Sequence, residues 1–426
     1  MRKTKLAVIG ASHFQLPLIE TAQRMGCEVH AFAWECGDVG ETVADVFHPI
    51  SIVEVDAIVA ACKEVGVDGI CTIASDLATV AVNHVAHELG LVGNSLECTR
   101  LSTNKHHMRD AFQRGGDPSP KSLTIGLDQA TSRVSVSVAG QTAGDAMDLR
   151  DFDPAAYGLA YPLIVKPTDR SGSRGVTKLE APNTPVSVST ALSEAFSQSF
   201  VKQAMVEEYV QGDEFSVEGI SWEGHHHILT ITRKATSGAP HFIETAHLQP
   251  ACLPPQTVEL IEQVTTHALD TLQVRNGASH TELKITPSGD VRIIEIGARM
   301  GGDCIGSDLV RLSTGIDFVA AVVDVAMGNE PDLTPKSAPA AAASCFMFNR
   351  EDVRAFERIQ KEHPELVQLW LMTAEEDEQV VSDSSTRLGH YVLSAPTAQE
   401  LAPFLPPKLA RAALASAQAN ATGDRA

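Results

Sequence analysis

The sequence predicts a mixed α/β and α+β protein with more than one domain. The chain has 426 residues, 43% of them hydrophobic and 20% charged, which is enough material for about three domains with real cores. Near the N-terminus, short apolar runs alternate with helical patterns, as they do in parallel α/β units. From residue 161 onward, short strand-like runs bounded by Gly, Pro or Asp follow one another, which is typical of an antiparallel sheet.

The first 95 residues predict one small α/β domain. KLAVI at residues 5–9 is a short buried-type strand. A helical stretch up to Met25 and a second strand over residues 28–33 complete a βαβ unit. The alternation continues with a helix over 52–65, a strand over 69–73 and a helix over 78–89. The GxGxxG fingerprint is absent here and GxxxxGK[ST] is absent from the whole chain, which disfavours NAD enzymes and P-loop kinases.

The middle and the end of the chain contain different patterns. The polar segment 126–151 indicates a surface insertion, with a hairpin around its alternating valines. Strand-like runs then occupy residues 162–166, 176–179, 205–210, 214–222 and 228–233. A Pro- and Ala-rich stretch over 331–343 indicates a linker. Beyond it we expect a helix over 351–360, a strand over 388–393 and a final helix.

Charge and cysteine usage exclude several function classes. With 33 basic and 54 acidic residues the formal charge is −21, which argues against binding nucleic acid or an anionic membrane surface. No apolar run reaches the roughly 18 residues of a membrane helix, and the apolar run at residues 6–9 is too short for a secretory signal. The eight cysteines form no CxxC pair. We therefore expect a soluble cytoplasmic protein with reduced thiols.

Residues 279–302, SHTELKITPSGDVRIIEIGARMGG, are the most informative segment for chemistry. Two strand-like runs flank the turn at 287–290, as in a hairpin. A symmetric turn places Glu282 directly opposite Glu295 on one face. Like charges in that position are destabilising, so one explanation is a hard cation such as Mg²⁺ between them. The other explanation is a solvated strand face, and the spacing alone leaves both open.

Two further segments contain residue types that suit a nucleotide. A buried-type strand ends at Lys166 and is followed by the glycine-rich tip SGSRG at 171–175. Backbone N–H groups of such a tip can approach phosphate oxygens, and Lys166 and Arg174 add positive charge. The run VEEYVQGDE at 206–214 follows, with a strand that ends among acids. By itself the tip is weak evidence, because most Gly/Ser-rich hairpin tips are simply flexible turns. The acidic run by itself is as typical of an exposed acidic edge as of a nucleotide contact.

Taken together, and in their order along the chain, the segments at 163–175, 206–214 and 279–302 resemble the ATP-grasp superfamily. The opening KLAVIGASHFQLPLIETAQRMG resembles the domain that precedes it in that superfamily. The resemblance implies an ATP-grasp fold over 96–335, preceded by a Rossmann-like α/β domain at 1–95. It also implies a mobile central subdomain at about 113–205 and a small C-terminal closing domain with a tail at 336–426.

The resemblance further implies roles for individual residues. Lys105 and Lys166 match the two lysines that bind ATP phosphates, and Arg299 matches the arginine that stabilises an acyl phosphate. The other matches are Ser171, Gly172, Ser173 and Arg174 for the phosphate lid, Glu207 for the adenine amino group, the backbone of Glu208 and Val210 for the adenine ring, Glu214 for the ribose, and Glu282 and Glu295 for Mg²⁺. Mn²⁺ is the expected substitute for Mg²⁺.

One position departs from the family pattern. Many ATP-grasp enzymes have Asn two residues after the second glutamate, where this chain has Gly297. An oxygen ligand is therefore missing. A second Mg²⁺ would use water instead or bind more weakly.

Within the superfamily, IEIGARMGGD, SDLATVAV and TAHLQPACLP resemble the bacterial L-amino-acid ligases, which make dipeptides. The resemblance implies a ligase that joins two amino acids through an acyl phosphate, with a homodimer as the expected assembly. Besides Arg299, the candidate substrate contacts are His247, His280 and Arg311. Packed histidines and a surface ion pair are the alternatives. SSTRLGH at 384–390 resembles the closing domain shared with biotin carboxylases.

Two other functions stay open at this point. The first is another ATP-grasp enzyme, of the purine-biosynthesis or biotin-carboxylase type, which dependence on bicarbonate would reveal. The second is a nucleotide-binding regulator without turnover, which the missing side chain at Gly297 motivates.

Overall fold

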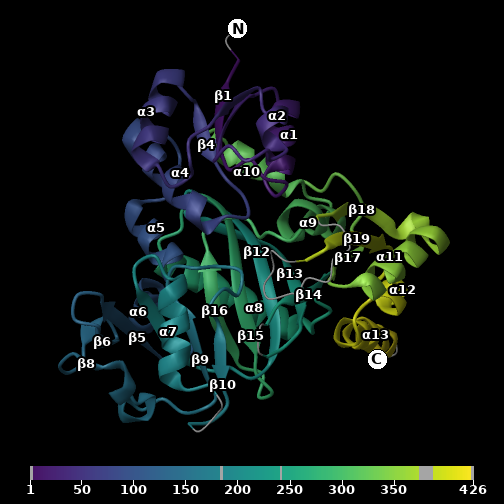
Figure 1. Cartoon of the computed structure of the whole chain (residues 1–426). Helices are drawn as coiled ribbons and strands as arrows, with labels where there is room; N and C mark the ends of the chain where they lie inside the picture. The colour runs from purple at the N-terminus through teal and green to yellow at the C-terminus, as the bar shows by residue number, and fades with distance from the viewer. Residues whose placement is uncertain (1–2, 183–185, 240–241, 374–386, 424–426) are drawn as a thin grey trace.

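The computed structural model describes residues 3–182, 186–239, 242–373 and 387–423. These residues form three β-sheets with helices packed against them, which confirms the predicted mixture of α/β and α+β structure. Figure 1 shows the N-terminal sheet at the top, a second sheet at the lower left, and the largest sheet running through the middle to the right. Within these described ranges, no helix is long and apolar enough to span a membrane.

The N-terminal sheet is parallel, with the strand order β3-β2-β1-β4. Its elements are β1 (Lys5–Ile9), α1 (Leu16–Arg24), β2 (Glu28–Phe32), α2 (Gly40–Val43), β3 (Val46–His48), α3 (Val55–Val65), β4 (Gly69–Cys71) and α4 (Asp76–Leu89). Because side chains alternate along a strand, Leu6 and Val8 face α1 while Ala7 and Ile9 face α3 and α4. Helix α10 (Phe318–Ala326) completes the α1 side, so a segment from late in the chain covers this sheet.

The second sheet has the strand order β10-β9-β11-β5-β6-β7, and β8 also pairs with β6. Its elements are β5 (Ser122–Asp128), β6 (Arg133–Val138), β7 (Gln141–Thr142), β8 (Met147–Asp148), β9 (Leu163–Pro167), β10 (Thr177–Leu179), α7 (Val188–Gln198) and β11 (Gln203–Glu208). The hairpin expected around the alternating valines of 126–151 is present and is formed by strands β5 and β6. The segment is nevertheless part of the sheet and not a surface insertion, because Val134 and Val136 are buried in the core.

The largest sheet has the order β16-β15-β12-β13-β14-β17-β19-β18. Its strands are β12 (Asp213–Trp222), β13 (His225–Thr236), β14 (Glu244–Gln249), β15 (Gly277–Ile285), β16 (Val291–Gly297), β17 (Ala341–Met347), β18 (Val367–Met372) and β19 (Gly389–Ala395). The predicted linker at 331–343 is too long, since its last residues are already in β17. Strand β17 pairs with β14, so the C-terminal strands extend the same sheet. Part of the SSTRLGH motif, at 384–386, lies outside the described residues.

Several helices pack around these sheets. They are α5 (Leu96–Thr103), α6 (Lys105–Gly115), α8 (Pro255–Thr271), α9 (Val310–Thr314), α11 (Arg350–Glu362), α12 (Ala398–Leu401) and α13 (Pro407–Gly423). Asn104 caps α6 by accepting a hydrogen bond from the backbone N–H of His106. The cap fixes where the helix begins, and so it places Lys105 in the first turn.

The β15–β16 hairpin contains the predicted Glu282–Glu295 pair, but the register arises in a different way from the one assumed. Next to the turn, Ile285 faces Val291, so the turn is not symmetric as assumed. A register shift between Glu282 and Leu283 adds one residue to β16 and restores the predicted partners. Glu282 therefore lies directly opposite Glu295. A bulge, which the residue pattern does not reveal, set this register.

Candidate functional site

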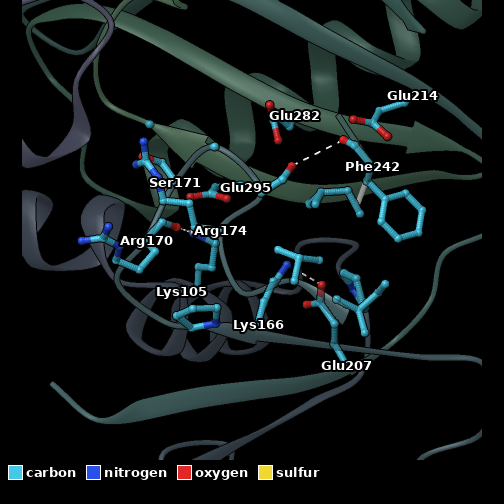
Figure 2. A pocket seen from close by; sticks show the side chains of 18 of the residues that line it. Lys105, Lys166, Arg170, Ser171, Arg174, Glu207, Glu214, Phe242, Glu282 and Glu295 are labelled. Carbon is cyan, nitrogen blue, oxygen red and sulfur yellow. Dashed lines mark hydrogen bonds and ion pairs between the residues drawn. The ribbon is translucent and has the colours of Figure 1, made fainter. Parts of the chain in front are cut away.

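A cavity of about 190 Å³ lies between the second sheet and the largest sheet. Its lining includes most of the residues singled out from the sequence, namely Lys105, Lys166, Ser171, Gly172, Ser173, Arg174, Glu207, Glu208, Val210, Glu214, His280, Glu282, Glu295 and Arg299. Figure 2 shows the two lysines on one side of this cavity and the acids of the largest sheet on the other. Residues up to 223 positions apart in sequence thus meet in one place, as with Asp76 and Arg299.

Lys105 connects the first helical turn of α6 to the β15–β16 hairpin. Its side chain is buried, and its Nζ donates hydrogen bonds to Glu295 Oε1 at 2.7 Å and to the carbonyl oxygen of Arg170 at 2.7 Å. Arg170 immediately precedes the glycine-rich tip. One ammonium group therefore links a candidate metal ligand with the base of the candidate phosphate lid.

Lys166 points from β9 toward Glu207 on β11, with which it forms a buried ion pair (Figure 2). Glu207 also accepts a hydrogen bond from Arg109 Nη2 at 2.9 Å. Burial lowers the pKa of Lys166, and the charge of Glu207 opposes that effect. Both carboxylate oxygens of Glu207 therefore bind cations in this structure. The predicted contact of Glu207 with adenine stays a prediction, and its observed contacts instead hold Lys166 in place.

Glu282 and Glu295 each have a lysine as counter-ion. Lys234 Nζ donates to Glu282 Oε1 at 2.6 Å and also lies 3.4 Å from Glu244 and 3.9 Å from Glu214. Burial opposes the charge of Lys234, but these three carboxylates raise its pKa. Burial likewise opposes the charge of Glu282, but Lys234 and the neighbouring imidazole hold its pKa well below the usual range. Glu282 is thus kept ionised, as a metal ligand must be.

The donor set at this hairpin suits Mg²⁺. Among the described residues, no three His, Cys, Asp or Glu side chains gather closely enough to hold a metal ion by themselves. The candidate metal ligands that the chain offers are two opposed carboxylates, those of Glu282 and Glu295. Mg²⁺ is commonly bound in this way, by one or two carboxylates together with water and substrate phosphates.

His280 lies next to Glu282 and is held by a buried acid. Its Nδ1 forms a short contact with Glu218, the residue directly opposite on β12, and its Nε2 lies 3.5 Å from Glu282 Oε1. Burial opposes the imidazolium charge, but Glu218 raises the pKa of His280 to about 9. The second oxygen of Glu218 accepts the backbone N–H of Gly301 at 3.0 Å. His280 is therefore a cation between a candidate metal ligand and the 301–302 segment.

Arg299 is fixed by an acid from the N-terminal sheet. Its Nε and Nη2 donate to the two oxygens of Asp76 at 2.8 and 2.9 Å, a bidentate contact. Burial opposes the charges of both side chains. The charge of Arg299 nevertheless lowers the pKa of Asp76, and the charge of Asp76 raises the pKa of Arg299. A Cβ at Gly297 would lie 2.6 Å from Asp76 Oδ1. The Asn of the family pattern would therefore have to displace the Asp76 carboxylate from its position beside Arg299.

The opposite end of the cavity is aromatic. The Tyr209 ring lies 6.1 Å from that of Phe242 and has the ammonium groups of Lys178 and Lys284 at 4.1 and 4.6 Å from its centroid. Lys284 also lies 3.6 Å from Glu214. The glycine-rich tip reaches this end, where Ser173 Oγ donates to the carbonyl oxygen of Phe242 at 3.4 Å. Glu208 and Val210, on either side of Tyr209, line the same end.

Two predicted substrate contacts lie elsewhere. His247 is fully buried on β14, 3.8 Å from Asp303 and against the Phe346 ring, and it lines neither this cavity nor the neighbouring one. Burial lowers its pKa, as expected for a packed neutral histidine. Arg311 lines a second cavity on the far side of the 301–302 segment. The surface ion pair considered for Arg311 is absent from the described part of the structure.

The sequence analysis missed several residues that shape the site, among them Asp76, Glu218, Lys234, Phe242 and Glu244. A signal for Lys234 was available, since it pairs directly with Glu214 across the β12–β13 hairpin. No sequence signal indicated Asp76, because its contact with Arg299 joins residues that are 223 positions apart.

Comparison with known proteins agrees with this geometry. An ATP-grasp domain model matches residues 159–308. Alanine–anticapsin ligase from Bacillus subtilis is 27% identical over 347 residues, which cover 73% of this chain and 68% of the relative. Carnosine synthase 1 from Gallus gallus is 33% identical over 31% of this chain but only 14% of its own length.

The fold comparison extends over almost the whole chain. The crystal structure of an L-amino acid ligase from Bacillus licheniformis matches with a TM-score of 0.74 and 24% identity, covering 95% of this chain and 96% of that one. An ATP-grasp domain therefore lies within residues 159–308, and the similar proteins support an enzyme that forms carbon–nitrogen bonds.

Proposed function

We propose that this enzyme joins two amino acids, with ATP as the energy source, and releases ADP and phosphate. The observation that supports the proposal best is the charge arrangement of the first cavity, where three cations, Lys105, Lys166 and Arg299, face the opposed pair Glu282 and Glu295. The names of its relatives, which include alanine–anticapsin ligase and dapdiamide A synthase, support amino acids as substrates.

The proposed residue roles follow from the two ends of the cavity. At the aromatic end, the backbone of Glu208 and Val210 would contact adenine and Glu214 the ribose. At the charged end, Lys105, Lys166 and the 171–174 tip would bind phosphates. A cavity of about 190 Å³ is smaller than the usual 300–1,000 Å³ of ligand sites. We infer that the tip moves when the nucleotide enters, as part of the mobile subdomain expected at about 113–205.

Mg²⁺ at Glu282 and Glu295 would supply charge neutralisation of the phosphates. The chain's own cations have the same purpose, because a carboxylate and ATP repel one another. With Arg299 fixed by Asp76, its guanidinium stands ready to orient the carboxylate of the first amino acid, the donor. That carboxylate attacks the γ-phosphorus, a P–O bond to ADP breaks, and an acyl phosphate forms.

The second amino acid, the acceptor, then attacks through its amino group. Its nitrogen lone pair forms a bond to the acyl carbon, the bond from that carbon to the phosphate oxygen breaks, and a proton leaves the nitrogen. Arg299 can stabilise the charge that develops on the acyl oxygen. Closure of the glycine-rich tip would exclude water, which otherwise hydrolyses an acyl phosphate.

The test is release of ADP and phosphate from Mg-ATP with single and paired amino acids, with product masses recorded. A dipeptide mass that appears together with ADP is expected. ADP release that requires bicarbonate and yields no peptide would refute the choice of substrate. AMP as the nucleotide product would refute the acyl-phosphate route.

A further inference from the structure

A second cavity, of about 740 Å³, lies against the first. Asp76, Gly297 and Arg299 line the first cavity, whereas Ala74, Gly301 and Gly302 line the second. The backbone N–H of Ala74 donates to the carbonyl oxygen of Met300 at 3.2 Å, which joins the two short segments. The wall between the cavities therefore consists of residues 74–76 and 297–302, and small residues face the second cavity.

Several charged residues that line the second cavity form no ion pair within the described chain, and Asp308 and Arg311 are the two that lie on the helical segment next to the wall. Arg311 is exposed, and its guanidinium forms no hydrogen bond or ion pair with any described residue. Asp308 lies three residues earlier, in the helical turn Ile305–Leu309, and its carboxylate accepts a hydrogen bond from Ser307 Oγ at 2.6 Å but has no ion pair within the described chain. Asp303 differs, because Arg387 Nη1 donates to it at 2.9 Å.

This pair of charges is complementary to a zwitterion. Asp308 and Arg311 are one helical turn apart, so both can be reached by a ligand whose charges are only a few bonds apart. Burial raises the pKa of Asp308, and a ligand cation would remove that penalty. The rest of the wall is largely apolar, with Phe14 and Leu16 near the N-terminal sheet and Leu369 and Leu371 on β18.

The chemistry of peptide-bond formation decides which substrate this cavity suits. The donor loses its carboxylate to the acyl phosphate, so that carboxylate must lie in the first cavity beside Arg299 and Glu282. The acceptor keeps its carboxylate throughout the reaction. An unpaired arginine on the far side of the wall suits a carboxylate that does not react.

We propose that the second cavity binds the acceptor, an α-amino acid with an apolar side chain, with Arg311 on its carboxylate and Asp308 on its ammonium group. The inference rests on the proposed function. The acceptor's amino group would approach the acyl phosphate at Gly301 and Gly302, where the wall between the two cavities carries no side chains of its own.

Two amines that differ only in their carboxylate test this proposal. L-Leucine and L-leucinamide are compared as acceptors, and hydroxylamine serves as a third amine that needs no binding site. The wild-type KM should be at least about tenfold lower for leucine than for leucinamide, because only leucine presents a carboxylate to Arg311. In Arg311→Ala this preference should fall to about one, and Arg311→Lys should retain part of it.

Hydroxamate formation separates failure of this proposal from failure of the proposed function. If the wild-type enzyme forms no hydroxamate from any amino acid, donor activation is absent and both proposals fail. If hydroxamate forms but Arg311→Ala retains the preference for leucine, the acceptor site is wrong and the ligase function stands. A loss of hydroxamate and dipeptide in equal measure would show a structural role for Arg311 and also overturn the assignment.

Asp308→Asn and Arg150→Ala complete the set. Asp308→Asn should raise the KM for leucine and leucinamide alike, since both carry the ammonium group. A change confined to leucine would contradict that role. Arg150, whose side chain is 83% exposed and pairs with Asp148 in the second sheet, is the matched control. Its replacement should alter neither KM.

Discussion

Gly301 and Gly302 are adjacent, yet the structure predicts opposite outcomes when each is replaced by alanine. A Cβ at Gly301 would lie 2.7 Å from His280 Nδ1 and 2.8 and 3.0 Å from the two oxygens of Glu218. A Cβ at Gly302 would meet only Ala74 Cβ, at 3.4 Å, which is ordinary contact. Neither glycine has a positive φ, so available space and not backbone conformation distinguishes the two.

The cost at Gly301 can be estimated from what the methyl group displaces. His280 and Glu218 are buried and bonded to each other, so neither can move aside freely. Overpacking of this kind typically costs about 1–3 kcal/mol. Weakening the hydrogen bond from the Gly301 N–H to Glu218 adds about 1.5–3 kcal/mol, because the acceptor is charged. We therefore expect Gly301→Ala to lower the free energy of unfolding by about 2.5–6 kcal/mol.

Gly302→Ala should change the free energy of unfolding by less than about 1 kcal/mol, with a small gain from reduced freedom of the unfolded chain. Urea denaturation of both variants and the wild type, followed by circular dichroism, measures the difference. Equal midpoints for the two variants would refute the reasoning, because the Glu218–His280 pair would then be free to give way.

The remaining predictions concern the candidate site and one surface histidine. Glu295→Gln should lower Mg²⁺-dependent turnover roughly a hundredfold without unfolding the chain, since it removes one of two opposed charges; unchanged turnover, matching the exposed control Glu262→Gln, would exclude the metal role. Lys166→Ala should raise the KM for ATP about 10- to 100-fold through loss of a charged phosphate contact, and an unaltered KM would exclude that contact. The hydrogen bond to Asp117 raises the pKa of His267. Its stabilising effect should be complete below about pH 6.5 and disappear as the pH rises through the folded-state pKa; His267→Asn should then lower the free energy of unfolding at acidic pH only, and a loss of equal size at about pH 8.5 would contradict this.

Much of the site was predictable from short segments. The strand that ends at Lys166, the glycine-rich tip and the Glu282–Glu295 hairpin each show alternation or turn residues over a few positions. Such patterns predict which residues share a face. The alternating valines of β6 illustrate the limit, because alternation identified a strand but not the sheet that buries it.

The sequence by itself determined the fold class and many of the residues that line the first cavity, because these depend on local periodicity and on the order of short motifs. Only the tertiary structure decided which distant groups meet. Asp76 fixes Arg299 across 223 positions, α10 covers the N-terminal sheet, and Asp308 and Arg311 face a second cavity. The physical reason is that such contacts form when whole helices and sheets pack together, and no pattern within one element specifies its distant neighbour.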